Sequence, residues 1–204
     1  MSTRVACCVY MVLCGVGLTR CISNGDPLEK GRVSRSPDEH VMLYLPDCPS
    51  GAEGCAGKAV PLGLDPRMPL RDLLDSIGAR LSRTYFARYG DRPTDIRFAV
   101  HAIEDIGTPG RWLEVGVIDI VDTAGAAMRT FFQGSAGASA TENVLLANFL
   151  QPQLDPPLLD GTVFLYNGEP MREMAHLDLS GIQTPNDLDP RVEVLMRRQA
   201  GDRP

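Results

Sequence analysis

Histidine, tryptophan and the common catalytic motifs are scarce in this sequence. Its 204 residues include three histidines and one tryptophan, and aromatic residues make up 6% of the chain. A carbohydrate-cleaving enzyme needs a cleft lined by aromatic side chains, so this class is disfavoured. No Gly-x-Ser-x-Gly motif, phosphate-binding loop or dinucleotide-binding fingerprint occurs in the sequence. The nearest approach, at residues 133–137, lacks the first glycine and predicts a turn before a helix. We therefore expect no catalytic residues and no cofactor.

An excess of positive charge is missing as well. The chain has 20 basic and 26 acidic residues, which gives a formal net charge of −6. A protein that binds nucleic acid needs clustered cations against the phosphate backbone, so nucleic acid is not an expected partner. The content of 44% hydrophobic and 23% charged residues is that of an ordinary globular protein. Such a chain is long enough to form one domain with a hydrophobic core.

The first 21 residues have the pattern of an export signal. Arg4 is followed by an uncharged, largely apolar run from Val5 to Leu18, and then by Thr19, Arg20 and Cys21. This run is shorter than the roughly 20 residues that a helix needs to span a membrane. A charged start, an apolar stretch and a boundary of this kind are typical of a secretory signal peptide. We therefore expect residues 1–21 to be a signal peptide and the protein to be exported.

The end of this segment, from Leu18 to Cys21, resembles the cleavage site of a bacterial lipoprotein, whose cysteine receives the lipid. Arg20 departs from that pattern, because the residue before the cysteine is normally small. The resemblance implies lipid attachment at Cys21 and a protein anchored to a membrane, on its periplasmic or cell-surface side. Residues 22–39 are polar and without hydrophobic periodicity, so we expect a flexible tether there.

Two further cysteines lie close together after the tether. Cys48 and Cys55 bracket the turn-rich residues 49–54, and exported proteins lie in compartments where disulfides persist. We expect a disulfide between them, with two free thiols as the alternative. No histidine accompanies the pair at the spacing of a zinc site, so we do not expect a metal.

Hydrophobic periodicity predicts the elements of one domain over residues 40–184. Leu70, Leu73, Leu74, Ile77 and Leu81 follow helical spacing, and Gly78 within this helix suggests close packing against a sheet. A second helix, ending before Pro152, is expected to begin at a capping box formed by Ser139 and Glu142. Strands are predicted at 41–45, 58–62, 96–103, 112–121 and 162–166, followed by a type I′ turn at Asn167-Gly168 and a short strand near Met171. Residues 185–204 are expected to form a partly ordered tail.

The order of these elements is strand, helix, hairpin, helix, strand. Because strands and helices do not alternate regularly, the sequence predicts an α+β fold rather than a parallel α/β sheet. We expect a two-layer sandwich, in which two helices cover one face of a mixed or antiparallel sheet.

Five short segments match one known domain in the right order. They are residues 41–47, 134–135, 140–143, 163–171 and 177–180. With these pieces, residues 40–182 resemble the GerMN domain of spore-germination and sporulation proteins and of actinobacterial surface lipoproteins. The resemblance implies a non-catalytic extracytoplasmic domain, similar in architecture to the ring-building modules of secretion and sporulation channels. Its implied partners are other envelope proteins or further copies of itself, although this chain has a single copy where sporulation members carry two.

An alternative function rests on His101, Asp119, His176 and Asp178. His176 and Asp178 would share one face of a strand and would hold a metal together with His101 or Asp119. Asp119 lies in an apolar strand, where desolvation raises the pKa of a carboxyl group. An envelope-associated hydrolase or metal-dependent enzyme requires these side chains to converge on one pocket, whereas a binding domain does not.

Overall fold

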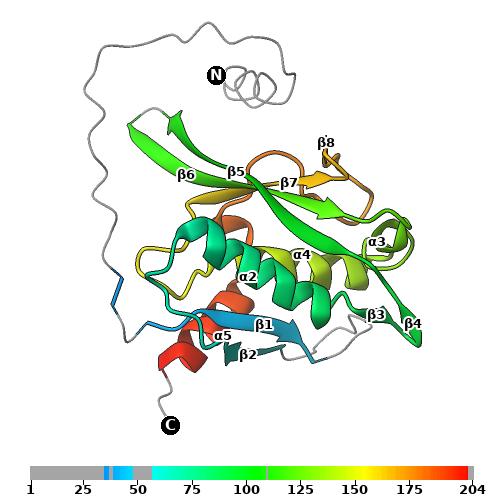
Figure 1. Ribbon diagram of the computed structural model, residues 1–204, viewed down its shortest axis with the longest axis horizontal. Coiled ribbons are helices and arrows are strands. Elements are labelled where there is room, and N and C mark those ends of the chain that lie inside the picture. Colours follow the sequence, from blue (N-terminus) through cyan, green and yellow to red (C-terminus); the bar gives the residue numbers. More distant parts are fainter. Residues whose placement is uncertain (1–34, 37–38, 48–56, 109, 202–204) are drawn as a thin grey trace, which may run out of the picture. The chain divides into compact units, whose positions relative to one another are not determined.

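The computed structural model describes residues 35–36, 39–47, 57–108 and 110–201 (Figure 1). They form a mixed domain of helices and mainly antiparallel strands, which confirms the predicted α+β sandwich. The expected signal peptide, the lipid site at Cys21, most of the tether and the Cys48–Cys55 pair lie outside the described residues. None of the helices in the described part of the chain is long and apolar enough to cross a membrane.

The main sheet has four strands in the order β5-β6-β7-β8. They are β5 (Arg97–Thr108), β6 (Arg111–Val121), β7 (Gly161–Tyr166) and β8 (Glu169–Pro170). β6 pairs antiparallel with β5 and parallel with β7, so the sheet is mixed. Asn167 and Gly168 join β7 to β8 with positive φ angles of 51° and 82°. A type I′ turn requires positive φ at both central residues, so the predicted turn is confirmed.

Beyond β8, the chain returns to the outer edge of β7. Thr162 and Gln183 exchange two backbone hydrogen bonds of 2.8 Å, which form an isolated antiparallel bridge. β8 itself has two residues, and its second residue is a proline, which has no backbone N–H to donate. The edge of the sheet beyond β7 is therefore occupied by this bridge and by β8.

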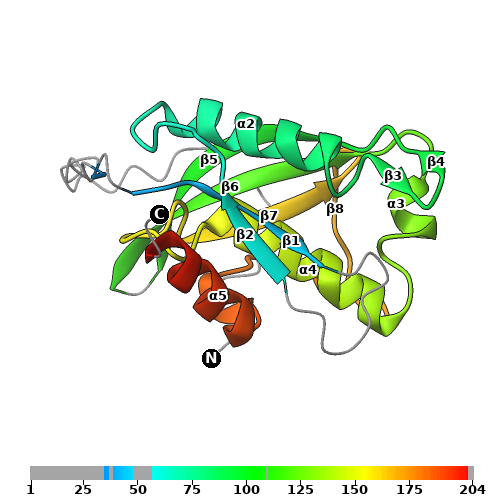
Figure 2. The ribbon, with the colours of Figure 1, turned by 90° about the horizontal axis from the view of Figure 1, so that it is seen from below.

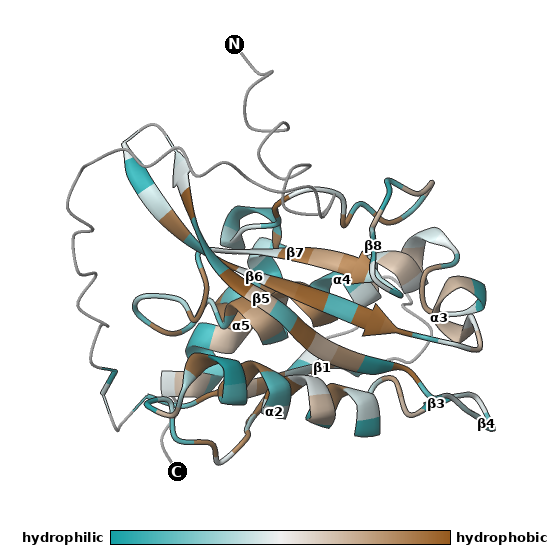
Figure 3. Cartoon of the chain, turned by 45° about the horizontal axis from the view of Figure 1, so that its top comes forward, coloured by the Kyte–Doolittle hydropathy of each residue, from teal (hydrophilic) through white to brown (hydrophobic). Residues whose placement is uncertain are grey.

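Two helices, α2 (Leu70–Arg83) and α4 (Ser135–Leu150), cover one face of the main sheet (Figure 1). α2 packs on β5, and α4 packs on β7. The predicted stripe of α2 is buried at Leu73, Leu74, Ile77 and Leu81. Burying four such side chains stabilises the domain by about 1.5–3 kcal/mol each. In Figure 3 the ribbon of α2 shows hydrophilic residues between the hydrophobic ones.

A second, two-stranded sheet lies on the other side of the helices from the main sheet (Figures 1 and 2). It consists of β1 (Met42–Pro46) and β2 (Gly57–Pro61), with β1 against α4 and β2 against α5. The sequence predicted both strands but only one sheet. The difference arises because α4 is apolar on all sides and buries side chains toward both sheets, among them Val144, Leu145, Leu146, Phe149 and Leu150.

The beginning of α4 differs from the sequence prediction. The helix begins at Ser135 after Gly134, which has a φ of 69°, and no side chain caps it. The predicted capping box is wrong, because Ser139 and Glu142 lie inside the helix. Burial raises the pKa of the Glu142 carboxyl above its usual range, and the carboxylates of Asp178 and Asp187 raise it further.

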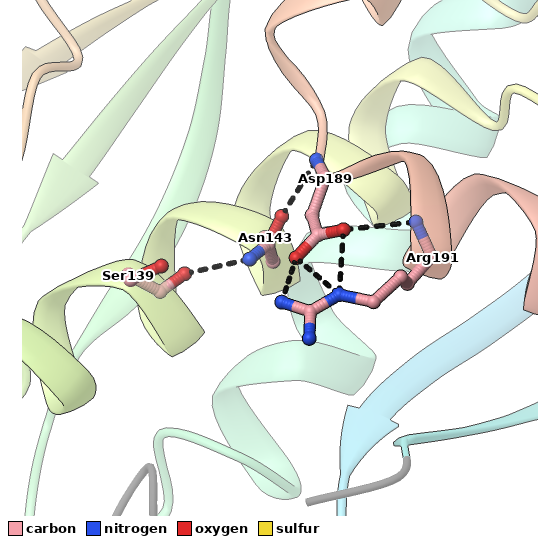
Figure 4. Close-up of polar contacts among 4 residues, drawn as sticks. All are labelled: Ser139, Asn143, Asp189 and Arg191. Atoms are coloured by element: carbon pink, nitrogen blue, oxygen red, sulfur yellow. Dashed lines mark hydrogen bonds and ion pairs between the residues drawn. The ribbon is translucent and has the colours of Figure 1, made fainter. Parts of the chain in front are cut away.

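The segment expected to be a partly ordered tail contains the 3₁₀ helix η1 (Pro185–Asp187) and the helix α5 (Pro190–Gly201). Val192 and Met196 of α5 are buried in the core, so residues 185–201 belong to the domain. Figure 4 shows how α5 is fixed to α4. The Asp189 N–H donates to Oδ1 of Asn143 (3.1 Å), and Oδ1 of Asp189 accepts from the Arg191 N–H (2.8 Å).

Gly78 allows α2 to lie close to the main sheet. A Cβ atom at this position would lie 2.8 Å from the Cβ of Phe98 on β5, which is closer than two carbon atoms pack. The predicted close packing of this glycine against a sheet is confirmed. Gly137 provides a contrast, because a Cβ atom there has nothing within 4 Å.

We expect opposite effects from alanine at these two helical glycines. Alanine gains up to about 1 kcal/mol of helix propensity over glycine. At Gly78 this gain is outweighed by the overlap with Phe98, because overpacking typically costs about 1–3 kcal/mol. Urea unfolding should therefore show Gly78→Ala to be less stable and Gly137→Ala to be more stable than the native protein. Equal stabilisation by both changes would contradict the close approach of α2 to β5.

Candidate functional site

The structure gives separate surroundings to the four residues of the enzymatic alternative, beginning with His101 and Asp119. His101 is exposed and lies at the β-bulge of β5, where the register shifts between Val100 and Ala102. Asp119 lies half-buried on β6, where its Oδ1 accepts a hydrogen bond of 3.0 Å from the Gly168 N–H. This carboxylate therefore holds the turn between β7 and β8.

The other two residues lie in the connection after β8. His176 is exposed between Met174 and Leu177, which form an isolated bridge. Oδ1 of Asp178 accepts hydrogen bonds from the N–H and the hydroxyl of Ser180. In the described part of the chain, no group of three or more His, Cys, Asp or Glu side chains is arranged to hold a metal ion. The geometry therefore assigns turn-forming roles to the two carboxylates.

A cleft of about 930 Å³ lies at the end of the domain where β5 begins. One wall is the hairpin of β3 (Arg88–Tyr89) and β4 (Arg92–Pro93), together with the residues up to Asp95. The other wall is the short helix α3 (Ala126–Arg129) with its flanking residues Ala124 and Thr130. No motif in the sequence pointed to these residues.

Asp122 fixes the wall formed by α3. Its side chain is 1% exposed, and its two carboxylate oxygens accept hydrogen bonds from the N–H groups of Ala126 (2.9 Å) and Ala127 (2.6 Å). The Tyr166 hydroxyl donates to Oδ2 of Asp122 at 2.8 Å. Burial, and then this hydrogen bond, raise the pKa of the Tyr166 phenol well above its usual value. The phenol therefore stays protonated and donates to Asp122.

The hairpin wall is closed at its base by Thr94, and that base is joined to α2 because the Phe86 N–H donates to the carbonyl of Leu81 at 3.1 Å. The Thr94 hydroxyl donates to the carbonyl of Phe86, and the Thr94 N–H donates to the carbonyl of Ala87 at 3.0 Å. Tyr89 is 49% exposed, yet its ring centroid lies 5.7 Å from that of Phe131. The apolar body of Tyr89 thus rests on the core while its edge remains open to the cleft.

Arginines gather around this cleft. Six of them lie on the elements that form this end of the domain: Arg80, Arg83, Arg88, Arg92, Arg97 and Arg129. None of the six takes part in an ion pair between described residues. The cleft itself contains Asp91 and Asp95, and Asp95 accepts a hydrogen bond of 2.8 Å from the Thr123 hydroxyl. The lining of the cleft therefore carries two arginines, Arg92 and Arg129, and two aspartates, and the other four arginines lie on neighbouring elements.

A second exposed feature is the far end of the β5–β6 hairpin. β5 pairs with β6 as far as Thr108 and Arg111, whereas β7 pairs with β6 only from Val115 to Ile120. The outer part of the hairpin, residues 105–108 and 110–114, therefore extends past β7 (Figure 3). We call these residues the arm.

The arm carries the most exposed large hydrophobic side chain in the described part of the chain. Trp112 is 60% exposed, and its ring lies over Gly107 of the opposite strand, where a Cβ atom would be 3.1 Å from the ring. The glycine thus gives the indole a flat surface to rest on.

β5 is an edge strand whose bulge is occupied by charged side chains of α2. Arg71 donates to the carbonyl of Val100 at 2.5 Å, and Asp75 accepts from the Val100 N–H at 3.4 Å. Beyond the bulge, over residues 102–108, β6 is the only described strand that pairs with β5.

Comparisons of this chain with protein-family models, with curated protein sequences and with solved structures find no match.

Proposed function

We propose that this protein is a non-catalytic interaction and assembly domain of the bacterial cell envelope. In this proposal the protein is exported, anchored to a membrane through a lipid at Cys21 and held away from the membrane by residues 22–39. Its partners are other envelope proteins or further copies of itself. The observation that carries the proposal is the exposed edge of β5 together with the arm and Trp112.

An open edge strand is a template for pairing with another chain. The backbone groups of residues 102–108 form such an edge, and added strands bind mainly through backbone hydrogen bonds. Glu104 and Asp105 lie on this part of β5. Their like charges disfavour direct pairing of this segment with an identical one, so a partner strand with basic residues fits this edge better.

Trp112 provides the apolar anchor that strand pairing alone lacks. Tryptophan is among the residues that most often contribute a large share of binding energy when they are buried in an interface. The ring is already held against Gly107, so little side-chain freedom remains to be lost on binding. The open edge of β5 and the exposed Trp112 together support protein binding. The carboxylates of Asp119 and Asp178, which the enzymatic alternative needs, are engaged in turns.

The test is chemical cross-linking in intact cells that produce the full-length protein. We expect a defined cross-linked partner or oligomer from the native chain, and at least a tenfold loss of that product from Trp112→Ala. Val194 of α5 is 56% exposed, so Val194→Ala is a matched control that should leave the product unchanged. Unchanged cross-linking by Trp112→Ala, or no defined product from the native chain, would contradict binding through the arm.

A further inference from the structure

The arginine-lined cleft is separate from the arm. It lies where β5 begins, whereas the arm is the opposite end of the same strand (Figure 1). The two surfaces can therefore be occupied independently of each other. A ligand in this cleft adds a second interaction surface to the proposed function, on which it rests, and this surface shares no residue with the arm.

The walls of the cleft combine apolar surface with two arginines. Tyr89, Pro93 and Ala126 provide apolar surface, while Arg92 projects from the hairpin and Arg129 from α3. The Arg129 guanidinium donates to the carbonyl of Ala124 at 2.5 Å, which holds it over the loop before α3. An arginine held in this way loses little freedom when it pairs with a carboxylate.

The two walls are also rigid enough to form a site without a partner. Asp122 fixes α3 through Ala126, Ala127 and Tyr166. Thr94 closes the base of the hairpin, and the buried Phe86 joins that base to α2 through the bond from its N–H to the carbonyl of Leu81. Because each wall is tied to the core by its own hydrogen bonds, the distance between them is set by the fold rather than by a ligand.

The charges of the cleft indicate what kind of ligand fits it. Asp91 and Asp95 lie among its lining residues and need hydrogen-bond donors, which a polyphosphate lacks. An extended peptide has carboxylates for the arginines and backbone N–H groups for the aspartates. We propose that this cleft binds an acidic peptide segment of a partner protein, with its carboxylates on Arg92 and Arg129 and an apolar side chain on Tyr89.

The test is fluorescence anisotropy with the full-length protein and a labelled peptide of alternating glutamate and leucine. We expect saturable binding that weakens with added salt, and no binding of the same peptide with glutamine in place of glutamate. Arg92→Gln and Arg129→Gln should each weaken binding about tenfold, because hydrogen-bonded pairs of arginine and carboxylate are among the strong polar contacts. Arg198 of α5 is exposed and distant in sequence, so Arg198→Gln is the control and should bind as the native protein does.

Charge reversal tests the assignment without depending on lost binding. Arg92→Glu should bind a peptide of alternating lysine and leucine more tightly than the native protein does. Trp112→Ala should bind the acidic peptide normally, so failure of the arm and failure of the cleft are distinguishable. Equal loss by Arg198→Gln, equal binding of the glutamine peptide, or displacement of the peptide by phosphatidylglycerol vesicles would each overturn the proposal.

Discussion

Asp122→Ala should lower the free energy of unfolding by about 3 kcal/mol, because it leaves buried donors unpaired at roughly 1–3 kcal/mol each before the site relaxes. The donors are the N–H groups of Ala126 and Ala127 and the hydroxyl of Tyr166. Urea unfolding measures the effect. Tyr166→Phe should cost less, because Asp122 then keeps its two backbone donors.

The matched control for this change is Asp105→Ala, which removes an exposed carboxylate from β5. It should change stability by no more than about 0.5 kcal/mol. Equal stability of Asp122→Ala and Asp105→Ala would show that the Asp122 carboxylate does not hold α3. Under the cleft proposal, Asp122→Ala should also weaken binding of the acidic peptide, since the wall that presents Arg129 loses its support.

Asn148→Leu should destabilise the protein by about 3 kcal/mol or more, because it leaves a buried N–H and a buried carbonyl of β1 without partners. Oδ1 of Asn148 accepts from the Tyr44 N–H, and its Nδ2 donates to the Tyr44 carbonyl, both at 2.9 Å. One turn further, Gln151 makes the same pair of bonds to Met42, both at 2.8 Å. The two side-chain amides thus take the place of a neighbouring strand.

Hydrogen exchange followed by mass spectrometry distinguishes this role from ordinary core packing. Asn148→Leu, which has a similar volume, should speed exchange in β1 and β2 more than in β5 and β6, because the small sheet loses its attachment to α4. Asn186→Leu, the same change at an exposed position, should change neither stability nor exchange. A uniform rise in exchange over both sheets would mean that Asn148 contributes only to the core as a whole.

The sequence predicted helices and strands well where one face is buried and the other is exposed to solvent. α2 shows this clearly, since its apolar side chains recur at helical spacing and its glycine marks the contact with Phe98. α4 lies between two sheets and is apolar all round, so its sequence contains no periodic stripe and its first turn was misplaced. The segment after residue 185 was missed although Asp189-Pro190 is a typical helix start, with an N-cap residue followed by proline.

The candidate sites depended on contacts that no local pattern contains. Asp122 contacts Tyr166, 44 residues later in the chain, and nothing near Asp122 in the sequence indicates that its carboxylate is buried. The arginines around the cleft are spread from Arg80 to Arg129 in a chain of net negative charge, so only the fold reveals their proximity. The single local signal was Asp122 itself, an aspartate after a strand and before a turn, which is typical of side-chain to backbone bonding.

The edge of the main sheet beyond β7 limits how this protein can polymerise. That edge is closed by β8 and by the bridge between Thr162 and Gln183, while β1 has its outer side occupied by the amides of α4. Among the described strands of the main sheet, β5 is the one with a long open edge to which a strand of another chain can add. A fibre grows by strand addition only if each unit offers two open edges, so under the proposed function this domain accepts one added strand at β5 and then stops.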